Sequence, residues 1–302
     1  MHCDKRNEGQ VQDLALAVFG LRCFAVTVLV ITLGACAQFD FEGKRDRLLE
    51  RAAEQGWRSE LIEAQPFTLF TARRYTGNSP VLTVYIEGDG RSWQDPYTPS
   101  DDPTPERPVG LRLALADVSA SVLYLARPCQ YRDLARSPGC DVRYWTTHRL
   151  APPVIASLSN AIDRAKVASR STSVELIGYS GGGAAAVLVA ARRQDVVRLV
   201  TIAANLDLAL WARLARVRPL SGSIDPALDA RATAHIPQLH LAGADDEIVP
   251  PAVIRSYLAK GGLGDAAMSE IPGFDHECCW HRAWAPRIAD IRRRIAPRAT
   301  GS

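Results

Sequence analysis

The sequence lacks a marked excess of either charge, and it lacks internal repeats and long low-complexity tracts. Its 36 lysine and arginine residues nearly balance 33 aspartate and glutamate residues, so the net charge is only +3. No dense basic stripe is present, and the chain therefore has no electrostatic footprint for nucleic acid. With 302 residues, 47% of them hydrophobic, it can bury a full core as one large α/β domain or two small ones.

A long hydrophobic run is missing as well. The stretch FAVTVLVITLG, at 24–34, is too short to span a bilayer comfortably. Because Arg22 precedes it and small residues follow, it has the layout of a secretory signal peptide. Leu33-Gly34-Ala35-Cys36 resembles the lipobox of bacterial lipoproteins, which implies removal of residues 1–35 and lipidation of Cys36.

The residue after the cysteine bears on localisation. The lipoprotein resemblance implies sorting to the outer membrane, facing the periplasm, because Ala37 rather than aspartate follows Cys36. A simple signal peptide cleaved after Ala37 is the alternative, and it predicts a soluble periplasmic or secreted protein. Both alternatives place the mature chain in an oxidising compartment.

Cysteine is scarce, with seven residues in the whole chain. On the lipoprotein interpretation two leave with the leader and Cys36 carries lipid, so the mature chain retains Cys129, Cys140, Cys278 and Cys279. Cys129 and Cys140 flank the polar loop CQYRDLARSPGC, and export predicts a disulfide between them. The adjacent pair can form a vicinal bridge, stay as two buried thiols or pair with the first two, and the sequence leaves these alternatives open.

Apolar runs alternate with helical patterns along the rest of the chain. The strand-like runs are PFTLFTARRY, VLTVYIEGDG, SVLYLARP, SVELIGYS, VRLVTIAA, PQLHLAGADD and the weaker AAMSEIPGFDH. Helical segments are expected near 151–168, 181–193, 251–260 and 280–295. Strands rich in Val, Ile and Leu with little alternation predict a three-layer α/β sandwich, with a mostly parallel sheet covered on both faces.

No linker divides this pattern, so residues 65–297 are expected to form a single domain. Residues 36–64 are expected to form an N-terminal helix, over 41–57, and a lead-in, and residues 298–302 a tail. The segment 91–110 is too rich in proline and aspartate to be a regular element and is expected to be a loop over one end of the sheet. A second irregular stretch, 215–235, can form a small cap.

One strand ends in a conspicuous cluster of small residues, Gly178-Tyr179-Ser180-Gly181-Gly182. This matches G-x-S-x-G between a strand and an Ala-rich helix, a sharp turn that lifts a serine hydroxyl clear of the sheet. Glycines are needed because side chains two residues either way would collide with the neighbouring strand and helix. The helix that follows points its N-terminal N–H groups toward a developing oxyanion.

A nucleophilic serine needs a base, and the base needs an orienting carboxylate. The segment LHLAGADDEIVP supplies Asp246 after a later strand, with Asp245 beside it and Asp207 as a weaker candidate. The segment EIPGFDHECCWHRAW supplies His276 after the last strand. His281 is expected inside the terminal helix with a structural role.

The segments GYSGG, GADDEIVP, GFDH and IEGDG, in this order, resemble the α/β-hydrolase superfamily over roughly residues 65–295. The resemblance implies Ser180 as nucleophile, His276 as base and Asp246 as the orienting acid. It also implies an oxyanion hole made by the backbone N–H groups of Gly181 and Asp89. Many members carry His-Gly where this chain has Glu87-Gly88-Asp89-Gly90, and an acidic side chain beside an oxyanion is unfavourable unless it points away.

The sequence therefore predicts an exported, lipid-anchored serine hydrolase that cleaves a carboxylic ester of a small molecule without a cofactor. A peptidase or amidase with the same three residues, and a non-catalytic binding lipoprotein, are the alternatives. A metal site at the His276 to His281 cluster is disfavoured, because adjacent cysteines suit tetrahedral zinc poorly. Chain length of the acyl group and oligomeric state are left open.

Overall fold

The structure is a computed structural model that describes residues 46–137 and 139–296. The leader, the lipobox with Cys36 and the tail at 298–302 lie outside the described residues. The chain divides into two compact units, Met1–Glu50 and Arg51–Ser302. Of the first unit only residues 46–50 are described, and they are helical. All strands of the described chain belong to the second unit.

An eight-stranded sheet forms the centre of the second unit, in the order β1-β2-β4-β3-β5-β6-β7-β8. The β1–β2 and β2–β4 pairs are antiparallel and the other pairs are parallel. The bounds are β1 Arg58–Ala64, β2 Phe67–Tyr75, β3 Val81–Ile86, β4 Ser121–Leu125, β5 Ser173–Tyr179, β6 Val196–Ile202, β7 Gln238–Gly243 and β8 Met268–Ile271.

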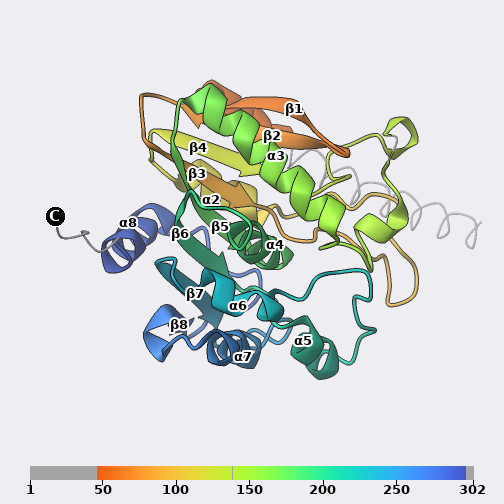
Figure 1. Cartoon of the computed structure of the whole chain (residues 1–302). Helices are drawn as coiled ribbons and strands as arrows, with labels where there is room; N and C mark the ends of the chain where they lie inside the picture. The colour runs from red at the N-terminus through yellow and green to blue at the C-terminus, as the bar shows by residue number, and fades with distance from the viewer. Residues whose placement is uncertain (1–45, 138, 297–302) are drawn as a thin grey trace, which may run out of the picture. The chain divides into compact units, whose positions relative to one another are not determined.

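Helices cover both faces of the sheet. In Figure 1, α3 and α4 lie in front of the sheet, and α2 and α8 lie behind it or at its edge. The helices are α2 Val109–Ala116, α3 Pro152–Ser169, α4 Gly181–Ala190, α5 Leu208–Leu214, α6 Ala230–Thr233, α7 Pro251–Gly261 and α8 Trp284–Arg294. Short 3₁₀ turns occur at 134–136, 142–144, 226–228 and 265–267. The expected three-layer fold is confirmed.

The amino-acid composition of the central elements explains their position. Every residue of β4 (SVLYL) and β7 (QLHLAG) is buried, as expected for strands inside a sheet that is covered on both faces. Helix α4 contains only Gly, Ala, Val and Leu, and all ten of its residues are buried. Because its first six residues are glycines and alanines, this helix can lie close against β5 and β6.

Four elements differ from the sequence-based expectation. Strand β1 lies within the segment expected as a lead-in, and its pattern is mostly exposed, so it has no apolar run to reveal it. Helix α2 begins at Val109, inside the expected loop of 91–110, and α5 and α6 are short helices that the sequence does not predict. His281 precedes α8, which begins at Trp284, so the expectation that it lies in the terminal helix is wrong.

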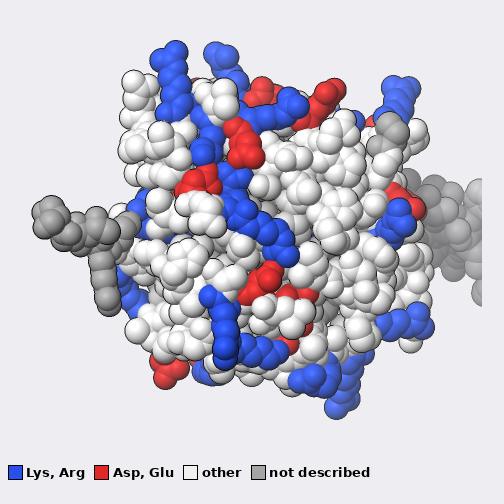
Figure 2. Space-filling view, viewed as in Figure 1, with Lys and Arg blue, Asp and Glu red and all other residues white. Residues whose placement is uncertain are grey.

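Charged groups on the face formed by α3 and α4 are largely paired. Figure 2 shows a band of Lys and Arg atoms across this face with Asp and Glu atoms beside it. Arg193 and Arg192 each lie 2.7 Å from a carboxylate, that of Asp163 and of Asp229 respectively. Among the described residues, no helix is long and apolar enough to cross a membrane.

Candidate active site

Ser180 occupies the turn between β5 and α4 in a backbone conformation that L-residues rarely adopt. Its φ is +51° and its ψ is −124°. A Cβ atom at Gly178 would lie 2.3 Å from the carbonyl oxygen of Gly182, and one at Gly182 would lie 2.3 Å from that of Glu87. The glycines thus permit the close approach of β5, α4 and the loop after β3, which holds the serine in its strained conformation.

The side chains of His276 and Asp246 form a hydrogen-bonded chain with Ser180. The Nε2 atom of His276 lies 3.0 Å from Ser180 Oγ, and its Nδ1 atom lies 2.9 Å from Asp246 Oδ2. Asp246 follows β7 and His276 follows β8, so both come from the carboxyl ends of parallel strands, at the edge where β5 delivers Ser180. The structure therefore brings together the three residues that the sequence singled out.

The acid and the imidazole are each fixed by further contacts. The Asp246 side chain is fully buried, and its Oδ1 atom accepts hydrogen bonds from the N–H groups of Ile248, at 2.9 Å, and Val249, at 2.8 Å. Its other oxygen is left to face the imidazole. The carbonyl oxygen of His276 accepts from Tyr179 Oη at 3.1 Å and from Trp280 Nε1 at 2.9 Å, which orients the loop that carries the histidine.

The neighbouring candidates have other contacts. Asp245 is exposed. Asp207 caps the N-terminus of α5 through the N–H of Leu210, at 3.0 Å, and pairs with Lys260 at 2.7 Å. Asp207 therefore has a structural role. Burial lowers the pKa of His281, and the positive charges of nearby arginines lower it further.

The loop after β3 lies against the serine turn. A Cβ atom at Gly88 would lie 3.4 Å from Ser180 Cβ, and one at Gly181 would lie 2.1 Å from Asp89 Oδ1. Within the described part of the chain, the backbone N–H groups of Asp89 and Gly181 donate no hydrogen bond. Two unused donors thus belong to residues that flank the serine hydroxyl.

An acidic side chain beside an oxyanion is unfavourable unless it points away. The Asp89 carboxylate does not point away from the site. It lies against Gly181 and is paired with two arginines, Arg149 at 2.6 Å and Arg127 at 3.2 Å. Burial alone would raise the pKa of Asp89, but the charges of Arg149 and Arg127 outweigh it and hold the pKa below its ordinary value. The aspartate is therefore ionised and its charge is compensated.

Glu87 is a supporting residue to which the sequence analysis gave no role. It is buried, and its carboxylate accepts from the N–H groups of Gly88 at 2.9 Å, and of Gly110 and Leu111 at 3.1 Å. The last two N–H groups belong to the first turn of α2, a favourable place for a carboxylate. Burial raises the pKa of Glu87. The sequence signal was an acidic residue directly after a buried strand.

The four described cysteines form two bridges. Cys129 is bonded to Cys140, with Cα atoms 5.5 Å apart, and Cys278 is bonded to its neighbour Cys279. Among residues 46–137 and 139–296, no group of three or more His, Cys, Asp or Glu side chains is arranged to hold a metal ion.

Comparison with solved structures finds the same architecture in proteins of very different sequence. The esterase Pf2001 of Pyrococcus furiosus has a TM-score of 0.55 and 14% identity, covering 80% of this chain and 91% of that one. A serine hydrolase homologue from Coxiella burnetii has a TM-score of 0.53 and 16% identity, covering 79% and 97%. Est1E from Butyrivibrio proteoclasticus, bound to ferulic acid, has a TM-score of 0.56 and 14% identity, covering 78% and 99%.

These similarities establish the fold class of the chain. It has the α/β-hydrolase fold. No protein-family model and no curated protein sequence matches the chain. Because the identities are 16% or lower among these structures, the similarity defines the fold, and an activity has to be argued from the site itself.

Proposed function

We propose that the protein is a serine hydrolase that cleaves a carboxylic ester through an acyl-enzyme. The observation that carries the proposal is the chain of hydrogen bonds from Ser180 Oγ through the His276 imidazole to the buried carboxylate of Asp246. The other oxygen of this carboxylate accepts two backbone N–H groups. The choice of an ester among acyl substrates is part of the proposal, in line with the esterase Pf2001, a protein of the same fold. Small-molecule esters are the proposed substrates.

In the first half-reaction, Ser180 Oγ attacks the acyl carbon while His276 Nε2 takes the hydroxyl proton. The carbonyl π-bond opens, and its oxygen becomes an oxyanion that accepts from the N–H groups of Gly181 and Asp89. Asp246 holds the Nδ1–H tautomer and stabilises the imidazolium. Collapse of the tetrahedral intermediate breaks the ester C–O bond, and the imidazolium protonates the departing alcohol.

In the second half-reaction, a water molecule takes the place of the alcohol. The imidazole accepts a proton from the water as its oxygen attacks the acyl carbon, and the same two N–H groups receive the oxyanion. The bond between the acyl carbon and Ser180 Oγ then breaks, and the serine takes back the proton. The products are the carboxylic acid and the free enzyme.

Labelling with a fluorophosphonate probe tests the nucleophile. We expect the wild type and Ser59→Ala, a substitution on exposed β1, to be labelled and Ser180→Ala to remain unlabelled. Equal labelling of Ser180→Ala would refute the proposed nucleophile. Matched ester and amide substrates then distinguish an esterase from a peptidase or amidase, and a wild type that reacts with neither probe nor activated ester would indicate a binding protein.

A further inference from the structure

Two buried arginines hold the side chain of the proposed oxyanion residue. Arg149 Nη1 donates to Asp89 Oδ2 at 2.6 Å, and Arg127 Nη1 donates to Asp89 Oδ1 at 3.2 Å. The side chains of Arg127, Arg149 and Asp89 are only 5%, 9% and 15% exposed. Each carboxylate oxygen thus has its own guanidinium, so the carboxylate cannot rotate without breaking a charge-assisted hydrogen bond.

The arginines are themselves fixed to the backbone. Arg149 Nε donates to the carbonyl oxygen of Thr146 at 2.7 Å, and Arg127 Nη2 donates to the carbonyl oxygen of Arg149. Gln130 extends the network, since its Oε1 atom accepts from the N–H of Arg127 at 3.1 Å and its Nε2 atom donates to the carbonyl oxygen of Gly88 at 3.0 Å. Both the Asp89 side chain and the preceding carbonyl group are therefore anchored to the segment after β4.

The charges of this cluster do not cancel. Within the described chain, Asp89 is the only carboxylate paired with Arg127 or Arg149, so two guanidinium groups face one carboxylate beside Gly181. Without the arginines, a carboxylate in contact with Gly181 would repel a developing oxyanion. With them, the cluster carries a net positive charge in a poorly solvated position, where charges act strongly.

We propose that Arg127 and Arg149 are positioning residues of the oxyanion hole. They hold Asp89 so that its N–H stays directed at the oxyanion, and their two positive charges outweigh the negative charge of its side chain. The inference rests on the proposed function, because it assumes that Ser180 forms an acyl-enzyme. The arginines touch Asp89 and not the reacting atoms, so they act through the loop after β3.

The test compares Arg149→Met and Arg149→Lys with the wild type in the full chain. The kcat and KM for p-nitrophenyl acetate are measured, together with the Ki of a trifluoromethyl ketone, which forms a tetrahedral adduct with an oxyanion. Because loss of one oxyanion donor lowers kcat by about 10²- to 10³-fold, a displaced donor in Arg149→Met should lower it by about 10- to 100-fold. We expect KM to change by less than about twofold and Ki to weaken in parallel with kcat.

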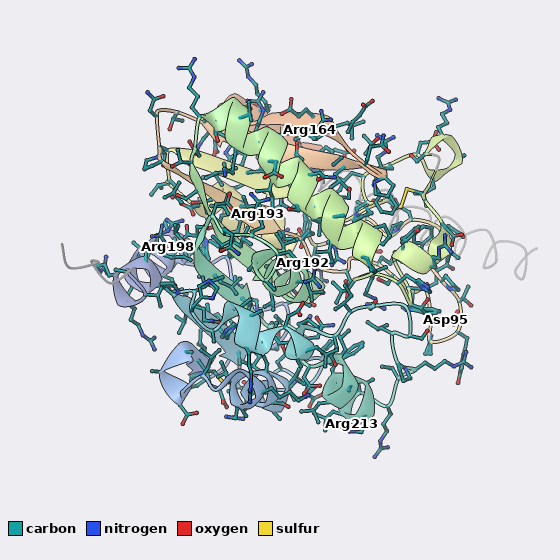
Figure 3. The ribbon with its side chains drawn as sticks, viewed as in Figure 1. Asp95, Arg164, Arg192, Arg193, Arg198 and Arg213 are labelled. Carbon is teal, nitrogen blue, oxygen red and sulfur yellow. A yellow bond between two sulfur atoms is a disulfide. The ribbon has the colours of Figure 1, made fainter. Side chains whose placement is uncertain are left out.

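Lysine should restore only part of the loss, since it keeps the charge but not the fork of two donors. Arg193→Met is the matched control, because Arg193 is 7% exposed, joins Asp163 of α3 to Asp195, and lies in the turn after α4, away from Ser180. Figure 3 shows Arg193 beside α3. Loss of the Arg193 guanidinium should lower the midpoint of thermal unfolding and leave kcat and KM unchanged.

Several outcomes would overturn the proposal while leaving the proposed function intact. One is a folded Arg149→Met with the kcat and Ki of the wild type, and another is an equal fall of kcat in Arg193→Met. If Arg149→Met does not fold, Arg149→Lys decides, and a kcat within threefold of the wild type counts against the proposal. A wild type that takes no fluorophosphonate label and hydrolyses no ester refutes the proposed function, and the inference with it.

Discussion

Asp246 and Asp245 are adjacent in the chain but differ in what their carboxylates contact. Asp246 is buried, accepts two backbone N–H groups and faces His276, whereas Asp245 is exposed. Only the first is placed to fix the imidazole tautomer. The pair therefore offers a test in which a role in the reaction is separated from mere proximity.

We predict that Asp246→Asn lowers kcat for an activated ester by about 10³- to 10⁴-fold, because an amide that donates toward Nδ1 favours the wrong tautomer. Asp245→Asn, the matched control, should stay within about twofold of the wild type. Steady-state kinetics at pH 7 with both variants checks the prediction. Similar rates for the two variants would show that Asp246 does not orient the base.

His240 is a buried histidine outside the proposed mechanism. Its Nδ1 atom lies 2.8 Å from Thr201 Oγ1 and its Nε2 atom lies 2.9 Å from Gln238 Oε1. Burial lowers the pKa of His240 to about 3. In the unfolded chain the pKa should be about 6.5. Between these two values the unfolded state binds more protons than the folded state, so protonation favours unfolding as the pH falls.

We predict that the free energy of unfolding falls by about 2 kcal/mol between pH 7 and pH 5 because of His240 alone. His240→Gln should remove this part of the pH dependence, and urea unfolding at both pH values measures it. The control is His235→Gln, because the His235 side chain is exposed. An unchanged difference between pH 5 and pH 7 in His240→Gln would contradict the prediction.

At the scale of the element, Arg292 links α8 to two buried carboxylates, one of them on β5. Arg292 Nη2 lies 2.7 Å from Asp117 Oδ2 and 2.6 Å from Glu175 Oε2, and neither carboxylate side chain is exposed. Trp284, Ile288 and Ile291 of the same helix are buried as well. Removal of the guanidinium would leave a buried carboxylate without its partner, although Arg198 also pairs with Glu175, at 2.7 Å.

We predict that Arg292→Met destabilises the protein by about 3 kcal/mol, the lower end expected when one partner of a buried ion pair is lost. Arg293→Met is the matched control on the same helix. Arg293 is 71% exposed and pairs with an exposed Asp290, so its loss should change stability by less than about 0.5 kcal/mol. Urea unfolding of both variants provides the measurement, and equal effects would argue against an anchoring role.

The bridge between Cys129 and Cys140 spans 11 residues of sequence. A bridge that closes a loop of that length lowers the conformational entropy of the unfolded chain, which stabilises the folded state by about 3 kcal/mol. We therefore predict that the double variant Cys129→Ser, Cys140→Ser loses about 3 kcal/mol of unfolding free energy. The control double variant Cys278→Ser, Cys279→Ser removes a bridge between neighbours and should lose under about 1 kcal/mol. Equal losses would contradict this chain-entropy argument.

At the scale of the whole molecule, the sheet was predictable where strands are buried and unpredictable where they are not. The seven strands β2 to β8 coincide with the apolar runs read from the sequence. Burial on both faces demands such runs in the central strands, whereas β8, which has no fully buried residue, was the weakest of them. Strand β1 carries charged and polar side chains on an exposed edge, so its pairing with β2 gives no sequence pattern. Its assignment as a strand depends on its pairing with β2.

The same division holds for the site. The residues that meet in the hydrogen-bonded chain were predictable, since each stands directly after a strand in a recognisable motif. The contacts of Asp89 were not, because Arg127 and Arg149 lie 38 and 60 residues further along the chain. Only the parallel arrangement of β3 and β4 brings the segments after these strands together. The sequence motifs identify the proposed reacting residues, whereas the arginines that hold Asp89 are recognised only in the folded structure.

Export of the chain remains a prediction, and it concerns residues outside the described part. The Leu33 to Cys36 motif predicts cleavage before Cys36 and lipidation of its thiol, and the bridge between Cys129 and Cys140 suits a compartment that permits disulfides. Mass spectrometry of the mature N-terminus in a bacterial host should find Cys36 with a diacylglycerol group. A lipidated protein should fractionate with membranes, whereas Cys36→Ser should not be lipidated. A mature chain that begins with unmodified Gln38 would instead establish the simple signal peptide, without touching the argument for the active site.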